Sequence, residues 1–233
     1  MPTKEVVCLA FSRKHGGSCF AGIETETGSW IRATGMYANG ALSDFDWHMD
    51  SVGETYATPS PLDVIEIDFI GPEPKPARPE NWQISTAHWK KTRVANAADA
   101  HILRHKIIRD AKIFHTYDRC VSSREIEAQP LDCSLSLVRP SALHWTPELD
   151  YYGRKRFRGE FTVSGHTYNL PLTDDGYATA LAHKAEDHLA NGLADPSVDL
   201  LLTISLGDLS VKAGCYHKLI AGVVELDRGC SVN

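Results

Sequence analysis

Short apolar segments separated by tight turns dominate the start of the chain. Residues 36–61 are rich in Gly, Ser, Asp and Pro and predict a long loop. Residues 71–79 contain four prolines, which fix φ and lack a backbone N–H, so this run predicts an extended connector. The β-branched and apolar runs predict strands at 5–11, 18–23, 29–34 and 62–70.

The C-terminal part of the chain shows a clearer order of elements. A Ser164-Gly165 pair between two alternating segments predicts a tight hairpin. Asp174 precedes an apolar helical stripe that ends near Gly192, which predicts a capped helix over 173–192. Strands are expected at 134–140, 155–163, 166–172, 198–205 and 217–226. Three strands, a helix and two strands are the order of an OB-fold, and this match covers 133–227.

Between these parts, residues 97–115 follow a helical period. On a helical wheel, Leu103, Ile107 and Phe114 gather on one side. The opposite side, interrupted only by Ile108, carries His101, Arg104, His105, Arg109 and Lys112. Most polar helix faces mix both signs of charge, so a basic amphipathic helix is expected; a solvated helix face is the alternative.

The predicted fold class is mainly β with a few helices: two OB-like β-barrels joined by a basic helical segment. The expected boundaries are 1–95 for an N-terminal barrel, 96–130 for the connector and 131–233 for a C-terminal barrel. The N-terminal barrel is expected to be the degenerate one, because it offers three strands, an irregular segment and another strand. A single larger barrel with added segments is the structural alternative.

Composition indicates a globular protein with an ordinary core, since 42% of residues are hydrophobic and 23% are charged. No run of about 18 apolar residues occurs, so we expect no membrane partner. The start lacks a long apolar signal segment, and the six cysteines form no CxxC pair. A reducing, cytoplasmic location is therefore expected.

Charge is unevenly distributed along the chain. The formal net charge is −6, yet residues 88–124 carry 9 Lys or Arg against 3 Asp or Glu. Residues 1–87 carry 6 against 12, and residues 125–233 carry 9 against 15. A basic segment between two acidic ones favours binding to a phosphorylated partner and excludes indiscriminate coating of DNA.

Several runs place cations beside aromatic rings or a glycine turn, which suits phosphates and stacked bases. Ser12, Arg13 and Lys14 precede a Gly-Gly turn, although an ordinary solvated hairpin explains them equally well. Trp30 and Arg32 share one strand face. In the run 154–158, alternate arginines point one way, either as a phosphate track or as a charged edge against aggregation. The predicted nucleic-acid or phosphate-binding residues are Ser12, Arg13, Lys14, Trp30, Arg32, Trp89, Lys90, Lys91, Arg93, Arg104, Arg109, Lys112, Arg154, Arg156 and Arg158.

Motifs for catalysis or metal binding are weak. His115, Cys120 and Cys133 are potential zinc ligands, but their irregular spacing favours buried free thiols. His101 and His105 lack the glutamate of a HExxH motif, and the pair Cys215–His217 hints at a thiol nucleophile. We expect no catalytic residue, no metal and no cofactor, while an enzyme of unrecognised type stays open.

The chain resembles the bacterial dual OB-containing domain family. The resemblance is carried by the runs Cys8–Cys19, Gly28–Arg32, Leu62–Ile67, Pro79–Trp82, Ser205–Gly207 and Cys215–Ala221. It implies the two-barrel architecture and a nucleic-acid- or nucleotide-binding module that acts as a sensor or accessory component of a prokaryotic conflict (anti-phage) system. The alternative is a protein-interaction adaptor that docks on a partner effector enzyme.

Overall fold

A computed structural model describes residues 1–14, 17–36, 40–43, 46, 58–85, 89–184, 186–193, 195 and 197–227, without the side chains of Arg13, Lys14, Asp187 and Asp227. In the described residues, the fold is mainly β with four short helices. No helix in this part of the chain is long and apolar enough to cross a membrane. The strands are β1 (Thr3–Lys14), β2 (Gly17–Glu24), β3 (Trp30–Thr34), β4 (Asp63–Pro72), β5 (Asn81–Ile84), β6 (Lys90–Val94), β7 (Cys120–Ser122), β8 (Leu135–Val138), β9 (Ala142–Leu149), β10 (Lys155–Val163), β11 (His166–Pro171), β12 (Val198–Ser210) and β13 (Cys215–Asp227). The helices are α1 (Ala97–Lys106), α2 (Ser123–Ala128), α3 (Asp175–Ala182) and α4 (Glu186–Ala190).

The N-terminal half is a closed barrel of five strands in the order β1-β2-β3-β5-β4, with β1 also paired to β4 and β6 added outside β4. β3 and β5 run parallel, and the other pairs are antiparallel. β1 pairs with β4 over residues 3–7 and with β2 over residues 6–14, and a bulge at Leu9 bends it. Apolar side chains such as Phe20, Ile31 and Phe69 fill the barrel. The expected degenerate barrel is therefore the regular one.

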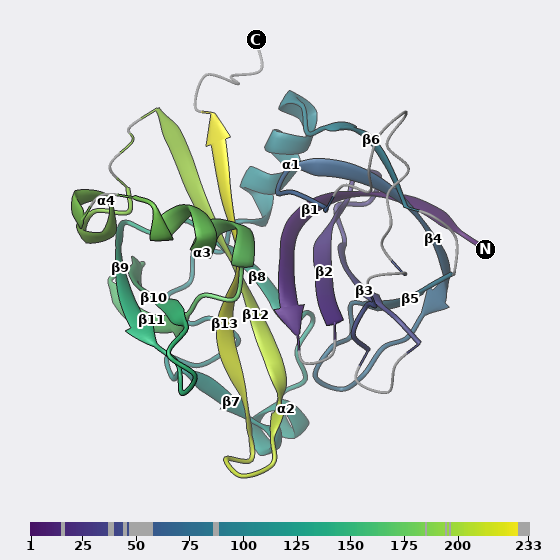
Figure 1. Cartoon of the computed structure of the whole chain (residues 1–233). Coiled ribbons are helices and arrows are strands. Elements are labelled where there is room, and N and C mark those ends of the chain that lie inside the picture. The colour runs from purple at the N-terminus through teal and green to yellow at the C-terminus, as the bar shows by residue number, and fades with distance from the viewer. Residues whose placement is uncertain are drawn as a thin grey trace.

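The C-terminal half follows the same connectivity but is an open half-barrel (Figure 1). It consists of a sheet β9-β10-β11 and a sheet β7-β13-β12-β8. Pro140, which has no N–H for a ladder, separates β8 from β9, so one bent strand becomes two. Among the described residues, a parallel bridge between Leu172, directly after β11, and Ile220 of β13 connects the two sheets. β9 is a strand that the sequence did not predict.

The expected helix over 97–115 ends at Lys106, so a basic helical linker is not confirmed. Ile107 forms a parallel bridge with Leu137 of β8, which takes it out of the helix. Phe114 and His115 have φ values of 53° and 64°, in the left-handed region that a helix excludes. Arg109 and Lys112 are therefore exposed on an irregular segment, and the domain boundaries stay predictions.

The two halves pack directly on one another, with the long β12–β13 hairpin between them (Figure 1). An apolar cluster at the junction combines Val7, Leu9 and Val64 with Leu201 and Val224, and α1 covers it through Leu103. The carbonyl of the bulged Leu9 accepts a hydrogen bond of 2.8 Å from the Thr203 hydroxyl. Gly222 is needed beside it, because a Cβ there would lie 2.0 Å from the same oxygen.

Candidate functional site

A groove of about 880 Å³ lies between the two halves. The N-terminal barrel lines it with residues of β1, β2 and β3 and with Arg78 of the loop before β5. The C-terminal half lines it with the β9–β10 hairpin, the end of β11, and β12 and β13. Four of the predicted binding residues line this groove: Ser12, Arg32, Arg154 and Arg156. The side chains of Arg13 and Lys14, next to Ser12 on β1, lie outside the described residues.

Arg32 is a buried bridge between the halves rather than an open cation. Its Nε donates to Glu80 Oε1 at 2.9 Å, and its Nη2 donates to the hydroxyls of Ser134 at 2.9 Å and Ser205 at 3.1 Å. Burial raises the pKa of Glu80, but the Arg32 charge and the hydrogen bonds from Ser134 outweigh it, so the net pKa is lowered. The network positions the groove floor and leaves Arg32 little capacity for a ligand.

Arg78 is a second bridge that sequence reasoning missed. Its Nη2 donates to the carbonyl of Gly207 at 2.7 Å and to Asp208 at 2.8 Å, across a bulge in β12. Its Nε is buried without a hydrogen-bond partner among the described residues. The only sequence signal was one arginine within a proline-rich connector.

The β9–β10 hairpin supplies the most accessible cations of the groove. The guanidinium groups of Arg154 and Arg156 both donate from Nε to one oxygen of Asp150, at 2.9 and 3.3 Å. Two positive charges thus share one carboxylate, and a net positive charge remains at the hairpin. Hydrogen bonds from the backbone of Arg154 come first among the causes that lower the pKa of Asp150, so this carboxylate stays ionised.

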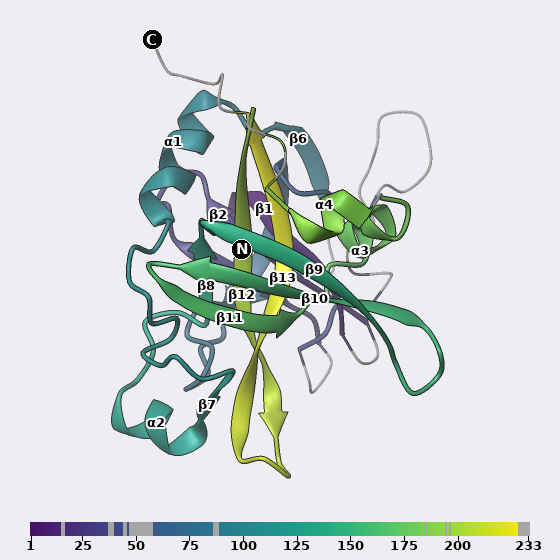
Figure 2. The same cartoon turned by 90° about the vertical axis from the view of Figure 1, so that its left-hand side faces the viewer.

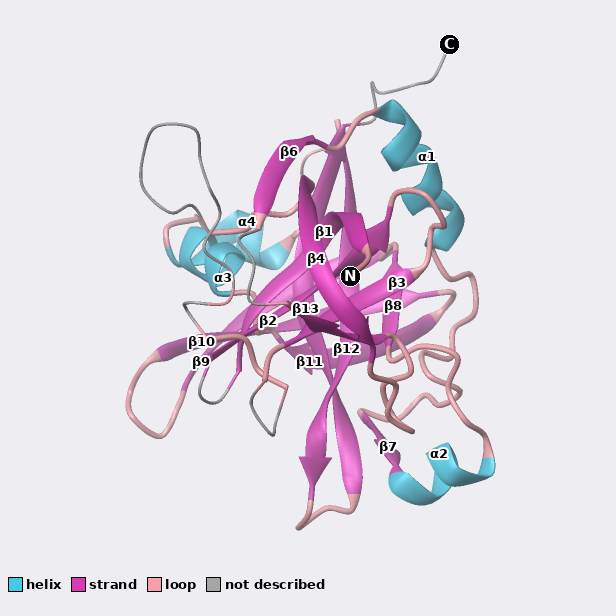
Figure 3. Cartoon of the chain, turned by 90° about the vertical axis from the view of Figure 1, so that its right-hand side faces the viewer, coloured by secondary structure: helices cyan, strands magenta, loops and turns pink. Residues whose placement is uncertain are grey.

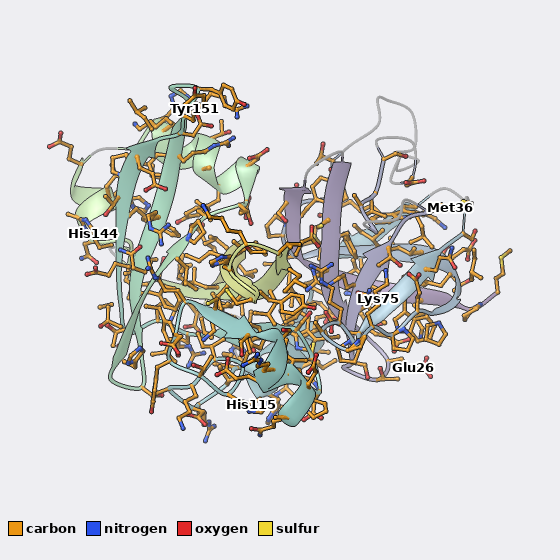
Figure 4. The ribbon with its side chains drawn as sticks, turned by 90° about the horizontal axis from the view of Figure 1, so that it is seen from below. Glu26, Met36, Lys75, His115, His144 and Tyr151 are labelled. Carbon is orange, nitrogen blue, oxygen red and sulfur yellow. The ribbon has the colours of Figure 1, made fainter. Side chains whose placement is uncertain are left out.

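Two tyrosines at the same turn were not predicted as site residues. Tyr151 is 96% exposed and Tyr152 is 77% exposed, and the Arg154 guanidinium lies 5.1 Å from the Tyr152 ring centre. Figure 4 shows Tyr151 at the tip of the hairpin, directed away from the protein. The run from Asp150 to Gly153 between two strands was the available signal, because aromatic rings on a turn have no core to enter.

The other predicted residues lie outside this groove. Trp89, one of the predicted binding residues, is fully buried and makes an edge-to-face contact with Phe20. Trp30 is half-buried against the junction, and Arg158 donates to Asn169. Lys90, Arg104, Arg109 and Lys112 are at least partly exposed, while Lys91 pairs with Asp63 and Arg93 with Asp99.

The predicted cations do not form one continuous surface. The Arg109 carbonyl accepts a hydrogen bond from Ser164, at the end of β10 opposite to Arg154. At about 3.3 Å per residue, the strand between them separates the two ends by roughly 30 Å. Figure 2 shows α1 and the β9–β10 turn on opposite sides of the molecule, and Figure 4 places His115 and Tyr151 at opposite ends of the C-terminal half.

The weaker chemical motifs are also placed by the structure. Asp174 caps α3 and accepts from the backbone of Tyr177 and Val223, as a capping residue does. The His101 and His105 rings contact each other through Nε2 atoms 3.0 Å apart. Among the described residues, His115, Cys120 and Cys133 form no ligand cluster, whereas Cys120 lies with Cys215 and His217.

A closed five-stranded barrel and an open one of the same connectivity, meeting at a shared groove, define a double OB-type protein. The chain belongs to the dual OB-containing domain family, whose model matches residues 4–223. This membership confirms the resemblance expected from the sequence, and it gives the chain a fold of the nucleic-acid-binding type. No sequence among curated proteins matches the chain.

Proposed function

We propose that the groove between the two halves binds a short single-stranded segment of nucleic acid or a nucleotide. OB-folds bind such ligands on the face of their second and third strands and on the loops between strands one and two and between strands four and five. In the N-terminal barrel, these parts are β2, β3, the connection from β1 to β2 and the loop at 73–80. Three of these four parts line the groove: β2 through Cys19 and Ala21, β3 through Arg32, and the loop through Arg78.

The same correspondence holds for the C-terminal half. When β8 and β9 are taken together as its first strand, the second and third strands are β10 and β11, and the two loops are 150–154 and 211–214. Arg154 and Arg156 come from the first loop and the start of β10, and Pro171 comes from the end of β11. Asp208 and His217 flank the second loop. That both OB-type binding surfaces turn toward one groove is the observation that carries the proposal.

The charges of the groove favour a small ligand over a long duplex. Four arginines line it, together with the acidic Glu148, Asp175 and Asp208. Arg154 and Arg156 pair with the same carboxylate, that of Asp150, so one positive charge there is not neutralised. A phosphate is therefore expected to bind most strongly at this place. The exposed Tyr151 and Tyr152 rings at the same turn offer stacking surfaces for one or two bases.

The test is fluorescence anisotropy at low salt with single-stranded DNA, single-stranded RNA, duplexes and nucleotides. The double variant Arg154→Glu/Arg156→Glu is expected to weaken binding about 10-fold or more, because two phosphate contacts are replaced by repulsion. The matched control Lys90→Glu/Lys112→Glu makes the same charge change outside the groove and is expected to leave binding within about 2-fold. Absence of binding to the whole panel, or equal losses in both variants, would overturn the proposal.

A protein-interaction adaptor is the second candidate, supported by the exposed apolar tip of the hairpin. Leu149, Tyr151 and Tyr152 are all well exposed there, and tyrosine is enriched at protein interfaces. An adaptor predicts that Tyr151→Ala/Tyr152→Ala abolishes capture of an effector while the nucleic-acid panel shows no binding. The role in an anti-phage system stays a prediction from the family resemblance, and plaque counts with the Arg154→Glu/Arg156→Glu variant test it.

A further inference from the structure

Two cysteines and a histidine that are far apart in the sequence meet on one face of the sheet β7-β13. In the antiparallel pair, His217 lies opposite Cys120, and Cys215 lies opposite Ser122. Side chains at alternate positions of a strand share a face, and directly opposite residues share one too. The backbone register therefore brings all three side chains together, beside α2 at the lower end of the β12–β13 hairpin (Figure 3).

The distances suit a tetrahedral metal ion. The two sulfurs and the imidazole nitrogen all lie within 4.8 Å of one another, and Cys215 Sγ is 3.9 Å from His217 Nε2. Zinc bonds of about 2.3 Å to sulfur and about 2.0 Å to nitrogen imply ligand-to-ligand edges of roughly 3.6–3.8 Å at tetrahedral angles. Small side-chain rotations close the remaining gap. Thiolate and imidazole ligands together are the donor set that zinc prefers.

Burial differs among the three ligands in a way that leaves one side open. Cys215 is buried, Cys120 is half-buried and His217 is exposed. His217 also lines the groove between the two halves, while Cys215 and Cys120 do not. Three protein ligands with a free fourth position are typical of zinc sites that bind water or a ligand, whereas structural sites are closed by four.

We propose that Cys120, Cys215 and His217 bind a zinc ion whose open side adjoins the inter-barrel groove. The expected absence of a metal, drawn from the sequence, is thereby replaced by a site assembled from residues 95 and 97 positions apart in the chain. The zinc site shares His217 with the lining of the groove. Its test measures zinc binding alone, and neither Arg154 nor Arg156 is a ligand.

The test is metal analysis of the reduced, tag-free full chain, followed by competition with a chromophoric zinc chelator and by cobalt substitution. About one zinc per chain and a thiolate-to-cobalt charge-transfer band are expected. Cys120→Ser and His217→Ala each remove a ligand at a partly exposed position, and each is expected to weaken zinc binding at least about 10-fold. Circular dichroism of both variants verifies their folding.

Two control variants separate this site from other thiols and histidines. Cys19→Ser removes a half-buried thiol of the groove, and His101→Ala/His105→Ala removes the exposed imidazole pair of α1. Both are expected to retain full zinc affinity and the cobalt spectrum. Zinc that is lost only in the His101/His105 variant overturns the proposal, as does zinc retained in Cys120→Ser. A Cys120–Cys215 disulfide in the purified chain, or reduced protein that binds no zinc, overturns it as well.

Discussion

The two halves of the molecule repeat one connectivity and differ in how their first strand bends. β1 bends at the Leu9 bulge and stays continuous, so its two ends pair with β4 and β2 and the barrel closes. The corresponding strand of the C-terminal half breaks at Pro140 into β8 and β9. Among the described residues, its two sheets are linked at Leu172 and Thr173, which contact Ile220 through a parallel bridge and hydrogen bonds. A bulge preserves the hydrogen-bond ladder on both sides, whereas proline interrupts it.

Because of this difference, the two halves contribute different parts to the groove. The closed barrel holds the buried Arg32–Glu80 network, which fixes the junction. The open half projects the β9–β10 hairpin, with its two paired arginines and its exposed tyrosines, over the groove. Both halves thus line the groove, and the open half supplies its most accessible charges.

The largest expected effect comes from breaking the buried network of the closed barrel. Arg32→Met leaves the Glu80 carboxylate buried without its cation and should lower the free energy of unfolding by about 3–5 kcal/mol. The matched change in the open half, Arg158→Met, removes hydrogen bonds to Asn169 at a half-buried position and should cost only about 1 kcal/mol. Urea denaturation measures both.

Equal losses in the two variants would contradict the expectation that the buried Arg32–Glu80 pair contributes more to stability than the contacts of Arg158. The double variant Arg32→Met/Glu80→Leu is expected to recover most of the lost stability, because no unpaired charge then remains. Continued loss in that double variant would show that the contacts to Ser134 and Ser205 carry the effect.

The next effect tests how closely the two halves fit. Gly222→Ala places a methyl group 2.0 Å from the Leu9 carbonyl oxygen, and backbone atoms on both sides must move. We expect a loss of up to about 3 kcal/mol, measured as a lower midpoint of thermal or urea unfolding. Gly71→Ala is the control, since no atom lies within 4 Å of its added Cβ. A Gly222→Ala variant as stable as the Gly71→Ala variant would mean that the junction is loose.

The strands of both halves could largely be predicted, because alternation and β-branched runs are local signals. The short strands β5, β6 and β7 were not predicted. β9 was missed too, since Thr146, Pro147 and Glu148 make its second half look like a loop. The helix was predicted too long because the helical period continues to Phe114, while Ile107 is taken by pairing with β8. The relative regularity of the halves depends on one bulge and one proline, and strand order alone does not reveal that.

The site was predicted only where neighbours in the sequence are neighbours in space. Arg154 and Arg156 share a short run, and both line the groove. The partners of Arg32 come from positions 48, 102 and 173 residues away, so its burial has no local signal. Trp89 beside two lysines looked like a surface aromatic, yet its ring enters the barrel core and its neighbour Lys90 points to solvent.

A third, smaller effect concerns the hairpin of the open half. Tyr151→Ala/Tyr152→Ala removes two exposed rings and should weaken binding of single-stranded nucleic acid about 10-fold, since stacked bases lose their platform. Stability should change by less than about 0.5 kcal/mol, because neither ring is part of the core. Tyr117→Ala removes another exposed tyrosine, outside the groove, and should leave binding unchanged. Equal binding by all three proteins would assign the hairpin tip to another partner.

The smallest expected effect is a contrast in the pH dependence of two buried carboxylates. Burial raises the pKa of Glu80, but Arg32 and Ser134 lower this pKa by more than burial raises it. Its folded pKa therefore lies below the usual value. Its contribution to stability is present above the unfolded pKa and is lost as the pH falls through the folded pKa. Among the described residues, Asp174 of the open half accepts hydrogen bonds from backbone N–H groups, and burial raises its pKa.

Asp174 therefore has the opposite sign. Its contribution is largest at acid pH and declines as the pH rises from the unfolded pKa to the folded one, where the buried carboxylate becomes charged. Carboxyl carbon NMR should show Glu80 titrating below its usual pKa and Asp174 above it. Urea unfolding of Asp174→Asn should be less sensitive to pH than that of the unmodified chain between the unfolded and folded pKa values of Asp174. If both carboxylates titrate at their usual pKa values, the pairing of Glu80 with Arg32 does not set it apart from Asp174, and the expected contrast is wrong.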